Sequence, residues 1–184
     1  MAAIFQVPAA RFQEVYWPFR PSYDEAKLDA ASYWRTVARD LGRPLGERDI
    51  LRLTQLDVQS WSHLDASMIE WARQVRAAGV RTAILSNMPL DLRNWIVNES
   101  GWLSDFDFAT FSCDLGIAKP AAAIYEHCLA GLGSAASETL FFDDRQPNVE
   151  AARRLGIPAF QFTTPRETFA ALKGQYRWPV PPPC

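Results

Sequence analysis

The sequence lacks the cysteine and histidine clusters that hold zinc or build a disulfide framework. Its three cysteines, Cys113, Cys128 and Cys184, are widely spaced and form no Cys-x-x-Cys pair, so we expect free thiols. Its two histidines, His63 and His127, lie far apart in the sequence and near no other typical metal ligand. A zinc site and a histidine-dependent catalytic pair are therefore not expected.

An excess of one charge and long apolar runs are also missing. The 19 Lys and Arg against 21 Asp and Glu give a net charge of -2, which provides no basic surface for nucleic acid or an acidic membrane. No uncharged run approaches the length of a membrane span. The first residues, "MAAIFQVPAAR", have no positive charge ahead of their apolar segment, unlike a signal peptide. We expect a soluble, cytoplasmic protein with neither a nucleic-acid nor a membrane partner.

The first third of the chain, residues 1–64, has helical patterning and no strand signal. Residues 29–42 begin with Asp29 as a candidate N-cap and end at Gly42, and residues 46–59 carry apolar side chains on one broad face. Aromatic residues are frequent here, and we expect them to form a core, with a substrate pocket as the alternative. They are Tyr16, Trp17, Phe19, Tyr23, Tyr33 and Trp34. Arg20 and Arg35 are expected to be exposed, with anion contacts as the alternative.

From Asp65 onward the pattern alternates between helix and strand. The pattern predicts helices over residues 65–79, 89–100, 120–133, 147–156 and 165–174, and strands over 80–85, 106–112, 139–144 and 158–162. Repeated β-α units with continuous apolar strands predict an α/β fold, with a Rossmann-like parallel sheet and flanking helices, over residues 65–175. The Pro-rich residues 176–184 are predicted to be a separate tail.

Polar residues follow three of these predicted elements where a parallel sheet would bind a ligand. Ser86-Asn87 and Asp143-Asp144 end two strands, and Lys119 precedes a helix. Each has an ordinary explanation alone, as a turn, as helix-capping acids and as a solvated lysine. Together, a hydroxyl, a cation and paired carboxylates are the groups that bind phosphate and Mg²⁺. The sequence therefore predicts a phosphate and magnesium site at one edge of the sheet.

Three stretches in this order resemble the motifs of the haloacid dehalogenase-like (HAD) hydrolase superfamily. They are "AILSNMP", "GIAKPAAAIYEHCL" and "LFFDDRQPNVEAARRLGIPAFQF". A response-regulator receiver domain also uses an acid pair, a hydroxyl and a Lys-Pro, but its acids come first in the chain. The resemblance covers residues 5–173, and the helical stretch from Arg11 to Gln59 is similar to the small helical cap of this superfamily.

The resemblance implies a role for each polar residue of these motifs. Ser86 and Asn87 are expected to bind phosphate, and Lys119 to steady the phosphate and the nucleophile as a catalytic residue. Asp144 is expected to contact Mg²⁺ directly, with Asp143 nearby or acting through water. Asn148 is expected to support the loop that carries the two acids. The implied substrate is a phosphorylated small molecule.

The aspartate nucleophile of the superfamily has no counterpart near the start of this sequence. The family carries it in an Asp-x-Asp motif after the first strand, whereas the first acid here is Glu14, within a helical pattern. In one alignment "AAIFQV" is the first strand and Gln6 replaces the nucleophile. In the other, which we favour, residues from Val7 onward are already cap sequence and the first, central strand is missing, as in an N-terminally truncated chain.

Three functions remain open at this point. The first is a Mg²⁺-dependent small-molecule phosphatase, whose residues 1–184 alone are expected to be inactive because the nucleophile is missing. The second is a non-catalytic binding protein with the same fold. The third is a haloacid dehalogenase, which would not need the metal-binding acids. Removing a central strand would leave buried backbone groups of the strands that end at Ser86 and Asp143 without partners. We therefore expect either that these two strands close up or that Met1 is not the natural start.

Overall fold

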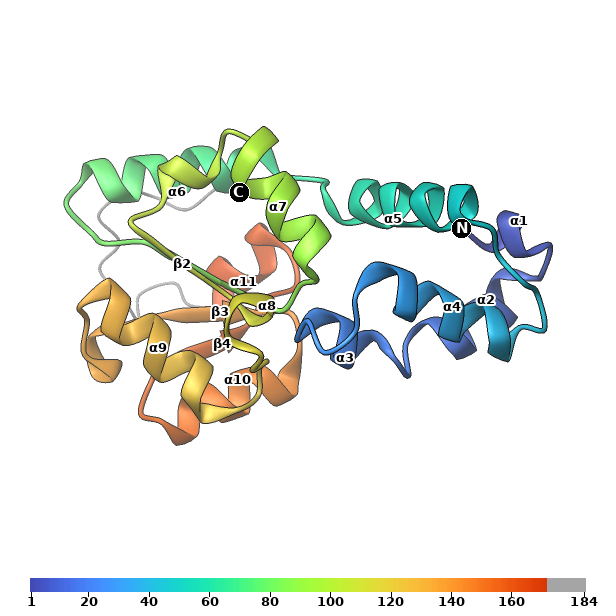
Figure 1. Ribbon diagram of the computed structural model, residues 1–184. Coiled ribbons are helices and arrows are strands. Elements are labelled where there is room, and N and C mark those ends of the chain that lie inside the picture. Colours follow the sequence, from blue (N-terminus) through green and yellow to red (C-terminus); the bar gives the residue numbers. More distant parts are fainter. Residues whose placement is uncertain (172–184) are drawn as a thin grey trace. The chain divides into compact units, whose positions relative to one another are not determined.

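The computed structural model describes residues 1–171 (Figure 1). They group into two compact units, which we describe separately. Unit 1 comprises residues 1–63, 87–101 and 111–118, and the described part of unit 2 comprises residues 64–86, 102–110 and 119–171. The predicted tail, residues 176–184, lies outside the described residues. No helix in the described part of the chain is long and apolar enough to cross a membrane.

Unit 1 is built from helices. They are α1 (Ala2–Phe5), α2 (Ala9–Tyr16), α3 (Arg20–Asp24), α4 (Ala30–Asp40), α5 (Glu47–Trp61), α7 (Leu90–Glu99) and α8 (Ser112–Leu115). Asp29 caps α4 as predicted, because its side chain accepts a hydrogen bond from Ser32 N. Residues 2–5 are helical, and Phe5 packs against Phe12 of α2. The alignment that made "AAIFQV" a strand is therefore wrong.

The aromatic residues of unit 1 form most of its core, as expected. Tyr16, Tyr23, Tyr33 and Trp34 are almost completely buried and pack together with Val37 and Leu53. The rings of Tyr23 and Tyr33 stack with their centroids 4.5 Å apart. Trp17 differs from the others, because about half of its side chain is exposed and lies edge-on to Trp61. Four of the six aromatic residues singled out in the sequence thus serve as core.

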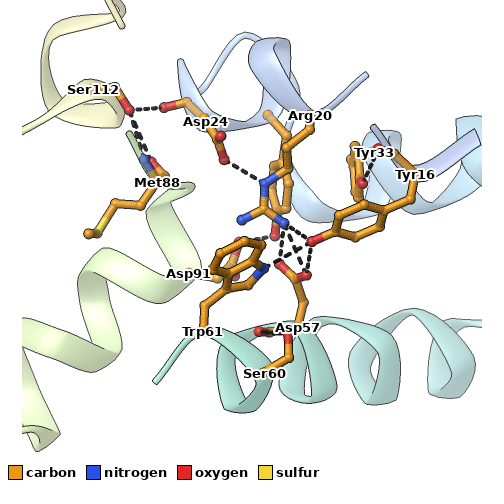
Figure 2. Close-up of polar contacts among 11 residues, drawn as sticks. Tyr16, Arg20, Asp24, Tyr33, Asp57, Ser60, Trp61, Met88, Asp91 and Ser112 are labelled. Carbon is orange, nitrogen blue, oxygen red and sulfur yellow. Dashed lines mark hydrogen bonds and ion pairs between the residues drawn. The ribbon is translucent and has the colours of Figure 1, made fainter. Parts of the chain in front are cut away.

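The expectation that Arg20 is exposed is wrong (Figure 2). Its guanidinium is buried between two carboxylates, 2.7 Å from Asp24 Oδ1 and 2.9 Å from Asp57 Oδ2. Tyr16 donates a hydrogen bond to Asp57 Oδ1 at 2.6 Å, and Trp61 Nε1 donates to the Tyr16 hydroxyl at 3.0 Å. Burial raises the pKa of Tyr16, so it remains a donor at neutral pH. The pairing satisfies charges that would otherwise be costly to bury.

A buried hydroxyl joins three segments of unit 1 that are distant in sequence. Ser112 Oγ donates to the backbone oxygen of Asp24 at 2.6 Å and accepts from Met88 N at 2.9 Å (Figure 2). Tyr23 adds a second link by donating to Asp91 Oδ2 at 2.9 Å. These contacts explain why residues 87–101 and 111–118 belong to unit 1 although residues between them belong to unit 2.

Unit 2 contains four short strands in two separate pairs. β1 (Ala83–Ser86) pairs with β2 (Phe108–Phe111), whose last residue is grouped with unit 1, and β3 (Phe141–Asp143) pairs in parallel with β4 (Ala159–Gln161). The helices of the unit are α6 (Ala66–Ala77), α9 (Ala122–Leu132), α10 (Gln146–Arg154) and α11 (Pro165–Ala171), with 3₁₀ turns at Leu103–Asp105 and Ala136–Glu138. The predicted α/β fold with parallel strands is confirmed, although each strand is shorter than predicted.

The two pairs of strands do not join into one sheet. Among residues 1–171, β1 has β2 as its only strand neighbour and β3 has only β4. The expectation that the strands ending at Ser86 and Asp143 close up is therefore wrong for the described part of the chain.

Candidate functional site

The candidate site lies where β1 and β3 end in unit 2. Ser86 is the last residue of β1, Asp143 is the last residue of β3, and Lys119 precedes α9 by three residues. Ligands of open α/β sheets bind at this carboxyl edge of the strands. The local sequence explains where the two strands end, because the apolar residues of β1 and β3 stop at Ser86 and Asp143.

Asp143 is the most constrained residue of the site. It is only 7% exposed, and both of its carboxylate oxygens accept hydrogen bonds. Lys119 Nζ lies 2.7 Å from Oδ2, while Arg145 N at 2.9 Å and Asn148 Nδ2 at 2.8 Å both donate to Oδ1. Burying a carboxylate without partners is costly, and these three contacts offset that cost. Its orientation is therefore fixed by the protein before any ligand binds.

Lys119 connects the ends of β1 and β3. Besides its ion pair with Asp143, its Nζ donates to the backbone oxygen of Leu85 at 2.7 Å. The same ammonium lies 5.6 Å from the centre of the Phe141 ring, within the range of a cation–π interaction. The Lys119 ammonium is therefore fixed at the carbonyl of Leu85, the residue before Ser86 in β1.

Asp144 has a different environment from its neighbour. Its side chain is exposed, and its carboxylate accepts no hydrogen bond from residues 1–171. Only its backbone is held, by a hydrogen bond of 2.9 Å from Gln161 Nε2 at the end of β4. The adjacent acids thus differ, since Asp143 is occupied by protein contacts and the carboxylate of Asp144 is available to a ligand.

The loop after β3 is held by α10 and α9. Asn148, on α10, is 4% exposed and connects through its amide to Asp143. Tyr125 of α9 donates to the backbone oxygen of Asn148 at 2.9 Å, and burial is the main cause of its raised pKa. The sequence analysis missed both Tyr125 and Gln161. Gln161 could have been found as a polar residue at a strand end, whereas nothing in the local sequence singles out Tyr125.

The other residues singled out in the sequence have fewer contacts with the candidate site. Ser86 is half-buried, next to the Leu85 carbonyl that Lys119 contacts. Asn87 follows it in the chain and is grouped with unit 1. His127 Nδ1 lies 3.2 Å from Thr110 Oγ1. The structure thus brings Lys119, Asp143 and Asn148 into direct contact, and places Ser86 and Asp144 beside them in the chain.

The donor set fits a magnesium ion better than a zinc ion. In residues 1–171, no group of three or more His, Cys, Asp or Glu side chains could hold a metal. Zinc sites in proteins usually need three or four such ligands. Magnesium keeps several waters and needs only one or two carboxylates, and the exposed carboxylate of Asp144 can provide one.

Comparisons with known proteins identify a matching family and similar folds. The family model of haloacid dehalogenase-like hydrolases matches residues 3–156. A HAD family enzyme of Bacteroides thetaiotaomicron, solved with magnesium and inorganic phosphate, superposes with a TM-score of 0.68 at 16% identity, covering 84% of this chain and 86% of that one. A predicted HAD-like hydrolase of Porphyromonas gingivalis has a TM-score of 0.63 at 23% identity, covering 76% of this chain and 69% of that one.

The curated relatives match this chain over different shares of their own length. Sesquiterpene phosphatase astK of Aspergillus oryzae is 26% identical over 152 residues, 82% of this chain and 76% of its own. Acyl-CoA dehydrogenase family member 10 of Mus musculus is 30% identical over 123 residues, 61% of this chain. Bifunctional epoxide hydrolase 2 of Rattus norvegicus is 29% identical over 133 residues, 66% of this chain. The matched region spans only 10% of the mouse protein and 24% of the rat protein.

Proposed function

Because the chain belongs to the haloacid dehalogenase-like hydrolase family, we propose that its site is that of a magnesium-dependent phosphatase acting on small phosphorylated molecules. The observation that carries this proposal is the position of Lys119, fixed between Asp143 and the end of β1. A fixed cation beside a hydroxyl and an exposed carboxylate suits a phosphoryl group, which needs charge neutralisation and positioning. The name of the A. oryzae relative, a sesquiterpene phosphatase, supports the reaction class.

Each residue has a proposed task in binding the phosphoryl group. The Ser86 hydroxyl donates a hydrogen bond to a phosphate oxygen, with Asn87 assisting, and Lys119 supplies positive charge. Asp143 keeps Lys119 in place, and Asn148 keeps Asp143 in place. Asp144 is the residue that would contact magnesium, with Asp143 nearby or acting through water. A bound magnesium ion would neutralise charge on the phosphoryl oxygens.

The Asp-x-Asp motif that carries the nucleophile of the family has no counterpart near the start of this sequence. Acyl-phosphate formation needs a carboxylate that attacks phosphorus, and the first acid of the chain, Glu14, lies in α2 of unit 1. We therefore propose that these residues alone bind a phosphorylated ligand without turning it over. The second candidate, a non-catalytic binding protein of this fold, is favoured by the same observation.

The assignment is tested with a generic phosphate ester. The purified chain is incubated with p-nitrophenyl phosphate and MgCl₂, and released p-nitrophenol is measured. We expect no release above that of the Asp144→Asn variant. Turnover by the wild-type chain that disappears in Asp144→Asn would show that the chain contains its own nucleophile, and the proposal of an inactive chain would be wrong. Halide release from a 2-haloacid without metal would instead favour a dehalogenase.

A further inference from the structure

The loop of residues 87–89 follows Ser86 and leads into α7. Its last two side chains, Met88 and Pro89, are buried. A buried backbone N–H needs an acceptor, and proline has no N–H to donate. Met88 N is therefore the backbone donor of the buried part of this loop, and it donates to Ser112 Oγ at 2.9 Å. A side chain that is distant in the sequence thus fixes the loop directly after the residues proposed to bind phosphate.

Ser112 is completely buried, and its hydroxyl joins two backbone segments of unit 1. It accepts from Met88 N and donates to the backbone oxygen of Asp24, the last residue of α3, at 2.6 Å (Figure 2). A hydroxyl has one hydrogen to donate and lone pairs with which to accept, so one side chain can serve both partners. Alanine at this position would remove both contacts and leave the buried Met88 N–H without this acceptor.

Tyr23, the residue before Asp24 on α3, provides a second contact to the start of α7. Its hydroxyl donates to Asp91 Oδ2 at 2.9 Å, and Asp91 lies in the first turn of α7. Burial raises the pKa of Tyr23, so the phenol remains protonated and able to donate at neutral pH. Residues 87–91 are therefore attached to α3 at two points.

The helix α3 is itself held by buried charges, which makes it a firm support for the loop. Arg20 Nε donates to Asp24 Oδ1 at 2.7 Å, and the same guanidinium is ion-paired with Asp57 of α5 at 2.9 Å (Figure 2). A buried ion pair of this kind is costly to break from one side. The backbone of Met88 is therefore connected, through Ser112 and Asp24, to a buried ion pair between two helices.

We propose that Ser112 and Tyr23 are positioning residues of the phosphate site, which hold residues 87–91 in the conformation that binds the phosphoryl group. The apparent affinity for a ligand falls with the fraction of protein in the competent conformation. Contacts that keep the loop in one conformation therefore raise phosphate affinity without touching the ligand. This role rests on the proposed function, because it requires that Ser86 and Asn87 bind phosphate. The attachment of the loop to α3 rests only on the contacts given above.

Removal of the Ser112 hydroxyl is the first test. Binding of inorganic phosphate by the full-length protein is measured by isothermal titration in the presence of MgCl₂. We expect Ser112→Ala to bind about three- to tenfold more weakly than the wild type. Ser100→Ala is the matched control, because it also removes a hydroxyl from unit 1, one that donates to Ile96 O at 2.6 Å near the end of α7. Equal affinities of the two variants would overturn the positioning role of Ser112.

Removal of the Tyr23 hydroxyl tests the second contact and has a closely matched control in Tyr33. Both side chains are almost completely buried, and their rings stack with the centroids 4.5 Å apart. The Tyr33 hydroxyl donates to the backbone oxygen of Tyr16 at 2.7 Å, so it is not part of the attachment. We expect phosphate affinity to fall about three- to tenfold in Tyr23→Phe and to change less than about twofold in Tyr33→Phe. A purely structural role would make the two variants equal, which would overturn the proposal, and this pair decides the matter if Ser112→Ala does not fold.

Hydrogen exchange of the proteins without phosphate distinguishes a failure of this proposal from a failure of the proposed function. We expect residues 87–91 to exchange faster in Ser112→Ala and Tyr23→Phe than in the wild type, and at wild-type rates in the two controls. Unchanged exchange in both folded variants would overturn the attachment to α3. Absence of phosphate binding in the wild type would overturn the proposed function and the positioning role with it, and exchange alone would then show whether the loop is attached to α3.

Discussion

Lys119 Nζ lies 2.7 Å from Asp143 Oδ2, and both side chains are more than nine-tenths buried. This ion pair connects the loop before α9 to the end of β3, and the second contact of Lys119, with Leu85 O, connects it to β1. A buried pair of this kind is costly to break from one side, because the remaining charge is left without a partner. Lys119 is also proposed to bind phosphate, so stability and phosphate binding should be linked at this residue.

Replacing Lys119 should therefore destabilise unit 2. Lys119→Met leaves Asp143 buried without its cation, and we expect a loss of about 3–5 kcal/mol in the free energy of unfolding. Urea denaturation followed by circular dichroism measures it. Lys27→Met is the matched control, because the Lys27 side chain is 61% exposed and its ion pair with Glu25 should contribute less than about 1 kcal/mol. Equal effects of the two substitutions would contradict the proposed importance of the buried pair.

Arg20 should be similarly sensitive in unit 1. Arg20→Met leaves Asp57, which is 1% exposed, without its positive partner, and we expect a loss of about 3–5 kcal/mol. Arg35→Met should cost less than about 1 kcal/mol, since Arg35 pairs with Glu47 in an exposed position. Urea denaturation followed by circular dichroism measures both losses. Recovery of stability in the double variant Arg20→Met/Asp57→Leu would confirm that the unpaired Asp57 carboxylate causes the loss.

The N-cap of α4 should make stability depend on pH in the acid range. Hydrogen bonds from Ser32 lower the pKa of Asp29 below its ordinary value of 3.8. The unfolded state therefore takes up the proton first, and stabilisation by the ionised cap is complete above pH 3.8 and decreases as the pH falls below it. Asp29→Asn keeps a capping side chain that cannot titrate. We expect Asp29→Asn to match the wild type in stability at pH 7 and to lose less stability below pH 4. Thermal melting at a series of pH values measures this. Identical slopes of melting temperature against pH for the two proteins would contradict the prediction.

The two cysteines of the described region should react slowly with alkylating reagents. Cys113 and Cys128 are free and buried, and burial raises the pKa of the Cys113 thiol to about 11 and also raises that of Cys128. Only the thiolate reacts, so at pH 8 little of either thiol is available. Mass spectrometry after iodoacetamide treatment should find both unmodified in the native protein and modified in urea. Rapid modification of either one in the native state would contradict their burial.

Local rules in the sequence predicted local features of the fold correctly. Asp29 caps its helix as predicted, because a cap depends only on the next three residues. The order of strands and helices was also correct, since apolar runs and breakers are local signals. The burial of Arg20 was not predicted, because its partner Asp57 is 37 residues away and belongs to another helix. Pairing between distant residues is decided by tertiary packing.

The candidate site also combines features that the sequence predicts with features that depend on tertiary packing. The proximity of Lys119 and Asp143 could be anticipated, because parallel strands bring their carboxyl ends together. The contrast between buried Asp143 and exposed Asp144 could not, because adjacent acids have the same local sequence and differ only in what surrounds them. The contact between Tyr125 and the Asn148 backbone depends on how α9 packs against α10, which no short pattern encodes.

Magnesium and phosphate binding tests the central claim most directly. Isothermal titration of the full-length protein with MgCl₂ in the presence of inorganic phosphate would be compared between wild type, Asp144→Asn and, as a control, Glu126→Gln on the exposed side of α9. We expect saturable binding in the wild type and in Glu126→Gln, and at least about tenfold weaker binding in Asp144→Asn. Absence of binding in the wild type, or equal binding in Asp144→Asn, would contradict a phosphate and magnesium site at the ends of β1 and β3.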